Sequence, residues 1–69
     1  MANQPEENEI SSLIRLMDDE DDYVWEHVRK KLISLGEDVL PFLDIAVRDE
    51  NLVLRRRALQ IINAILIKI

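Results

Sequence analysis

Three groups of side chains in this 69-residue sequence could do chemistry. The first is an unbroken acidic run at residues 18–22, whose carboxylates are the hard oxygen ligands that calcium and magnesium prefer. The second is the single histidine, His27, and the third is a run of three arginines at residues 55–57. Each group has a functional and a structural interpretation, and the neighbouring residues favour one of the two.

The acidic run lacks the spacing of a helix-loop-helix calcium site. Such a loop needs glycine at its sixth position and glutamate at its twelfth, where counting from Asp18 gives Tyr23 and Arg29. Aspartate is also common at turns and helix N-termini, because its carboxylate accepts free backbone N–H groups there. A turn with a helix cap is therefore the favoured prediction, and a divalent-cation site at residues 18–22 is the alternative.

The histidine and the arginines also favour structural interpretations. His27 has no second histidine and no cysteine as a partner, so zinc binding and acid–base catalysis lack the groups they need. Successive arginines point about 100° apart around a helix and cannot form one phosphate clamp. We expect one of them to pair with the turn acids and the others to be solvated; an anionic ligand or an acidic partner helix is the alternative. The sequence thus predicts no catalytic residue, no cofactor and no metal.

Composition excludes several classes of function. Fourteen acidic and nine basic residues give a net charge of -5, which disfavours nucleic acid as a partner. The N-terminus is not signal-like, and no apolar stretch approaches the ~20 residues that cross a bilayer. One glycine, two prolines and no cysteine disfavour an all-β or disulfide-based fold. We expect an all-α cytoplasmic protein with neither a nucleic-acid nor a membrane partner.

The spacing of apolar residues predicts four helices, at about 8–17, 22–35, 38–48 and 52–68, after a disordered or frayed segment at 1–7. In the second helix, Val24, Val28 and Leu32 fall on one stripe, and Gly36 fits the position that ends it. Trp25 borders this stripe, either as a packing residue or as an anchor for a partner. The third helix is apolar over more than half its circumference and is expected to be the most buried.

The two halves of the chain can be aligned without a gap. Matching residues are always separated by the same number of positions as Leu13 and Leu43, and we call this separation the repeat offset. The other matching pairs include Asp19 with Asp49, Val24 with Leu54, Val28 with Ala58, and Leu32 with Ile62. A helix pair repeated at fixed spacing is typical of α-solenoids. The sequence therefore predicts one helical domain at 8–69, with repeat one at 8–36 and repeat two at 37–69.

The segments LIRLMDDEDDYVWEHVRKKLISLGEDVLPFL and VRDENLVLRRRALQIINAI resemble HEAT-like repeats, in which a turn aspartate and an arginine early in the second helix recur. The resemblance implies an α-α superhelix of two helical hairpins, with Asp19 and Asp49 in the turns and Arg55 as the arginine of repeat two. Trp25 stands at the arginine position of repeat one. The first repeat is also similar to the helical segment preceding the catalytic domain of some bacterial transglutaminase-like proteins, whose chemistry cannot be carried over without a cysteine.

The last helix suggests a function. Solenoids normally need about three or more repeats and polar caps, whereas this helix carries an additional apolar row that includes Leu59 and Leu66. The sequence predicts a non-enzymatic interaction or scaffold module that binds a protein partner or a second copy of itself through this C-terminal helix. The candidate partner-binding residues are Leu59, Leu66, Ile69, Trp25 and Arg56. The alternatives are an accessory helical domain of a larger transglutaminase-like enzyme and a divalent-cation-binding domain.

Overall fold

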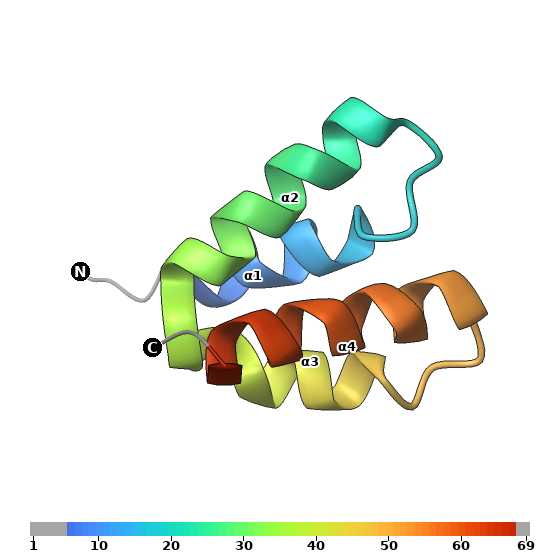
Figure 1. The fold of residues 1–69 in the computed structure, drawn as a ribbon. Helices are drawn as coiled ribbons and strands as arrows, with labels where there is room; N and C mark the ends of the chain where they lie inside the picture. Colours follow the sequence, from blue (N-terminus) through green and yellow to red (C-terminus); the bar gives the residue numbers. More distant parts are fainter. Residues whose placement is uncertain (1–5, 68–69) are drawn as a thin grey trace.

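The structure is a computed structural model that describes residues 6–67, and over this range it is all-helical, without strands. The helices are α1 (Glu6–Arg15), α2 (Asp22–Leu35), α3 (Leu40–Ala46) and α4 (Leu52–Ile67), and the 3-10 helix η1 (Gly36–Val39) joins α2 to α3 (Figure 1). The all-α fold class predicted from the sequence is confirmed. None of the described helices combines the length and the apolar character needed to traverse a bilayer.

Two helices have boundaries that differ from the prediction. α1 begins at Glu6, within the segment expected to be frayed, and ends at Arg15. It ends early because the N–H groups of Leu16 and Met17 donate to carbonyls three residues back, which tightens the last turn. α3 is shorter at both ends than the predicted 38–48, since η1 occupies the residues before it. Residues 1–5 and 68–69, including Ile69, lie outside the described part of the chain.

Gly36 ends α2 with a backbone conformation that favours glycine. Its φ is 72° and its ψ is -145°, and its N–H donates to the carbonyl of Ile33. The positive φ agrees with the position proposed from the sequence, but the ψ value is far from the ordinary left-handed helical value of about +47°. A Cβ atom at this position would meet nothing within 4 Å. The requirement for glycine is therefore conformational, and it lets α2 lead directly into η1.

The helices share one hydrophobic core. α1 packs against α2 and α3, and α4 packs against the same two helices from the other side of the core (Figure 1). The buried side chains are Ile10, Leu13, Met17, Val28, Leu32, Val39, Leu43, Ala46, Ala58 and Ile61. α3 has the largest share of buried and half-buried residues among the described helices, as expected from the sequence, although Ile45 on its outer side is 69% exposed.

The two turns at one end of the molecule repeat the same hydrogen bonds at the repeat offset. The Asp21 N–H donates to Asp19 Oδ1 at 2.8 Å, and the Asn51 N–H donates to Asp49 Oδ1 at 2.9 Å. Asp21 Oδ1 then accepts from the Tyr23 N–H at 2.8 Å, and Asn51 Oδ1 accepts from the Val53 N–H at 2.9 Å. The repeat seen in the sequence therefore extends to local backbone geometry.

These bonds show which residue of each turn caps the following helix. Asp21 and Asn51 are the residues whose side chains accept the first free N–H groups of α2 and α4. Asp19 and Asp49, the residues expected from the sequence to form the turn or the cap, lie two positions earlier and hold the backbone of the capping residue instead. The acidic run thus provides one cap and one turn residue for α2.

Removing the caps should destabilise the protein measurably. Asp21→Ala and Asn51→Ala are each expected to lower the free energy of unfolding by about 0.5–2 kcal/mol. Asn51→Ala should cost more, because this side chain accepts from two N–H groups and also donates to Asp18 Oδ2 at 2.7 Å. Chemical denaturation would measure both losses. Glu20→Ala is the control in the same turn, and an equal loss for all three variants would contradict the assignment of the caps.

Candidate functional site

The outward side of α4 carries a row of exposed leucines. Leu52, Leu59 and Leu66 are 62%, 51% and 62% exposed. Residues seven apart drift by only about 20° around a helix, so the three side chains form a nearly straight row. Arg55 and Arg56 are exposed beside its N-terminal half. We call these five residues the α4 flank; Leu52 was not among the candidates predicted from the sequence, although its seven-residue spacing from Leu59 could have identified it.

The matching side of α2 is covered in the structure. Three residues along one side of α2 are half-buried, namely Trp25, Arg29 and Ile33, and Trp25 lies against Arg57 of α4. Their counterparts at the repeat offset are exposed, namely Arg55, Leu59 and Asn63. In the middle of the α4 flank, Arg55 and Leu59 therefore match half-buried residues of α2, whereas Leu52 and Arg56 match Asp22 and Glu26, which are exposed.

The opposite sides of the two helices show the reverse relation. On α2 three polar residues face solvent, namely His27, Lys31 and Ser34. Their counterparts on α4 are buried or half-buried, namely Arg57, Ile61 and Ala64. α4 thus uses one side to cover α2 and leaves free the side that would receive the next helix.

Arg57 connects α4 to the first turn. Its Nη1 donates to the carbonyl oxygens of Met17 at 2.6 Å and Asp19 at 3.0 Å. Its guanidinium lies over the Trp25 ring, 4.6 Å from the ring centroid, which is within the range of a cation–π interaction. The contacts satisfy two carbonyls left free after α1 and fix α2 against α4.

This arrangement corrects the expectation for the arginine cluster. Arg57 is the member of the cluster that reaches the first turn, and it binds backbone carbonyls instead of turn carboxylates. Arg55 and Arg56 are exposed, as expected for solvated members of the cluster. Trp25, which the sequence left open as a partner anchor, is half-buried beneath Arg57 and packs against the core.

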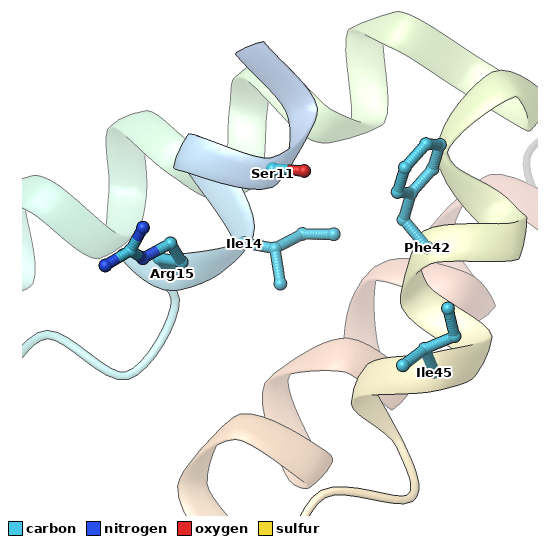
Figure 2. Close-up of a pocket in the computed structure, with 5 residues that line it drawn as sticks. All are labelled: Ser11, Ile14, Arg15, Phe42 and Ile45. Carbon is cyan, nitrogen blue, oxygen red and sulfur yellow. The ribbon is translucent and has the colours of Figure 1, made fainter. Parts of the chain in front are cut away.

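A shallow depression of about 350 Å³ lies between α1 and α3. Figure 2 shows Ile14 of α1 facing Phe42 and Ile45 of α3 across it, while the Arg15 guanidinium points away from the gap. Small-molecule sites usually combine apolar walls with several converging polar groups. Among the five lining residues, the Ser11 hydroxyl is the one polar group that points into this depression (Figure 2). The depression therefore lacks the converging polar groups of a small-molecule site, and the α4 flank is the stronger candidate for a functional surface.

The acidic run and His27 do not come together as a site. In the described residues, no three acidic or histidine side chains gather in a group that could hold a metal ion. Asp19 and Asp21 direct carboxylate oxygens to backbone N–H groups of their own turn. His27 is exposed on the polar side of α2.

Comparisons with protein-family models, with curated proteins and with solved structures find no match to this chain. The resemblances to HEAT-like repeats and to the helical segment of transglutaminase-like proteins therefore remain predictions.

Proposed function

We propose that this protein is a non-enzymatic interaction module that binds a helix of a protein partner along the α4 flank. In this proposal the helices form a short α-α superhelix of two HEAT-like hairpins, the first made of α1 and α2 and the second of α3 and α4. The superhelix presents α4 at its open side. No catalytic residue, cofactor or metal takes part.

The superhelix is supported by the match between the two halves. The order of helices and the capping bonds at Asp21 and Asn51 recur at the repeat offset, and so do two pairs of buried residues, Leu13 with Leu43 and Val28 with Ala58. α1 lies against α3 and α2 lies against α4, so equivalent helices are neighbours. Solenoids stack equivalent helices in this way, and each repeat contacts only the next.

The observation that carries the proposed function is the open α4 flank. Leucines scattered singly on a surface are ordinary, but these three recur at a spacing of seven and form an apolar strip on one side of α4, with Arg55 and Arg56 beside it. Covering apolar surface is favourable by about 25 cal/mol per Å². Trp25, the counterpart of Arg55, lies against Arg57 of α4, and this equivalent contact favours a helix as the occupant of the strip.

Site-specific photocrosslinking in cells that produce the protein would test the proposal. A photoreactive amino acid at position 59 is expected to give defined protein adducts, because a bound helix would lie within reach of this side chain. The same amino acid at position 30, an exposed site on the polar side of α2, is the matched control and should give none.

A second substitution separates binding at the α4 flank from chance contact. Adding Leu66→Asp, two helical turns from the probe along the same row, should abolish the adducts at position 59 by placing a charge in the apolar strip. Equal adducts at positions 59 and 30, or adducts that survive Leu66→Asp, would overturn the proposed function.

A further inference from the structure

Resting on the proposed function, we propose that the helix bound to the α4 flank is α4 of a second copy of this chain. The two helices lie antiparallel about a two-fold axis that passes beside Leu59. Each copy presents the same surface to the other, as in most homodimers.

The spacing of the leucines is symmetric about Leu59. In an antiparallel pair centred there, Leu59 meets the partner's Leu59, and Leu52 meets the partner's Leu66. These three leucines are the exposed apolar residues of the row, so each finds an apolar counterpart in the second copy. One row of spacing seven is thus sufficient to build both halves of the interface.

Charge determines the relative direction of the helices. In a parallel pair, the exposed Arg55 and Arg56 of each copy would face the same residues of the other and repel them. In the antiparallel pair, Arg55 lies opposite the partner's Asn63, and both arginines approach the negative C-terminal end of the partner's helix dipole. η1, which carries the exposed Glu37 and Asp38, lies at the same end of the molecule as the C-terminus of α4 (Figure 1).

A head-to-tail contact between copies fits less well. It would place the free side of α2 on the α4 flank, with His27, Lys31 and Ser34 against the leucines. These polar residues cannot supply an apolar cover, and Lys31 would place a charged group against the leucine row. The symmetric pair has neither defect.

Crosslinking of single-cysteine variants of the purified protein would test the proposal, because the natural chain has no cysteine. With a short bis-maleimide, Leu59→Cys alone should give a covalent dimer. Leu52→Cys and Leu66→Cys should give little dimer separately, since identical positions would lie about 14 residues apart along the helices, or about 21 Å. The two variants mixed, one of them tagged, should give the crosslinked heterodimer. Lys30→Cys, on the polar side of α2, is the control and should remain monomeric.

The outcomes distinguish the possible arrangements. Dimers of Leu52→Cys with itself and of Leu66→Cys with itself would indicate a parallel pair and overturn the proposal. Sedimentation of the natural chain should show a concentration-dependent shift from the 8.1 kDa monomer towards twice that mass, which Leu59→Asp abolishes. Monomeric behaviour at every concentration would also overturn the proposal. If the purified chain were monomeric but photocrosslinking in cells gave an adduct heavier than a dimer of this chain, the result would contradict self-pairing and support the proposed interaction with another protein.

Discussion

Leu32→Ala is expected to lower the free energy of unfolding by about 2–5 kcal/mol, which can unfold a domain of this size. Leu32 is 0% exposed and lies in the last turn of α2, in the core that α2 forms with the other helices. Removing its buried methyl groups loses their transfer free energy and leaves a cavity that the surrounding helices fill only in part. A chain of this length has a total free energy of unfolding of only about 3–10 kcal/mol. Urea denaturation followed by circular dichroism would measure the loss.

The same substitution at Leu59 provides the control. Leu59 is half-exposed on the outward side of α4, so Leu59→Ala should change the stability by less than about 1 kcal/mol. Both variants should be compared at a protein concentration at which the natural chain is monomeric, so that self-association does not contribute. Equal losses for the two leucines would mean that the arrangement of α2 in the core is wrong.

Arg57→Met is expected to lower the free energy of unfolding by about 2–4 kcal/mol, which is a large effect for an arginine on a helix of a small protein. The substitution keeps an unbranched aliphatic side chain but removes the donor to the Met17 and Asp19 carbonyls and the cation over Trp25. A hydrogen bond from a charged group contributes about 1.5–3 kcal/mol, and a cation–π contact contributes about 0.5–1 kcal/mol or more. Thermal unfolding should show a lower midpoint, by roughly 4–8 °C for each kcal/mol lost.

Its neighbours in the sequence are matched controls. Arg55→Met and Arg56→Met change the same residue type on the same helix, but both side chains are exposed, so each should alter the stability by no more than about 0.5 kcal/mol. A double-mutant cycle of Arg57→Met with Trp25→Leu would isolate the contact between the guanidinium and the ring. Three equal losses, or a coupling energy of zero, would contradict the bridging role of Arg57.

Much of the helical framework could be predicted from the sequence. The stripe that includes Val28 and Leu32 is periodic within a single helix, so its buried side can be recognised without knowing what covers it. The turns were also recognisable, because Asp and Asn compete for backbone N–H groups within two or three residues of their own position. The residue that caps α2 was harder to predict, because Asp19 and Asp21 both stand in one acidic run. Only the path of the backbone assigns the cap to Asp21.

The candidate surface was predicted only in part. Leu59 and Leu66 were selected because they lie outside the main stripe of the last helix, and the structure leaves both exposed. Leu52 was missed, and Trp25 is half-buried against Arg57. The difference has a physical cause: the position of a residue on its own helix follows from its spacing, whereas its cover depends on a second helix.

The sequence by itself determined that the chain is helical, where its turns lie and that its halves match at a constant offset, because each of these can be read from local spacing along the chain. Only the tertiary structure decided which of the three arginines reaches the first turn, namely Arg57, and that α2 and α4 bury different sides. Trp25 and Arg55 hold equivalent places in the two halves, yet one has α4 beside it and the other has solvent. Equivalent sequence positions acquire different surroundings because the first half has a neighbour on the side where the described second half is open.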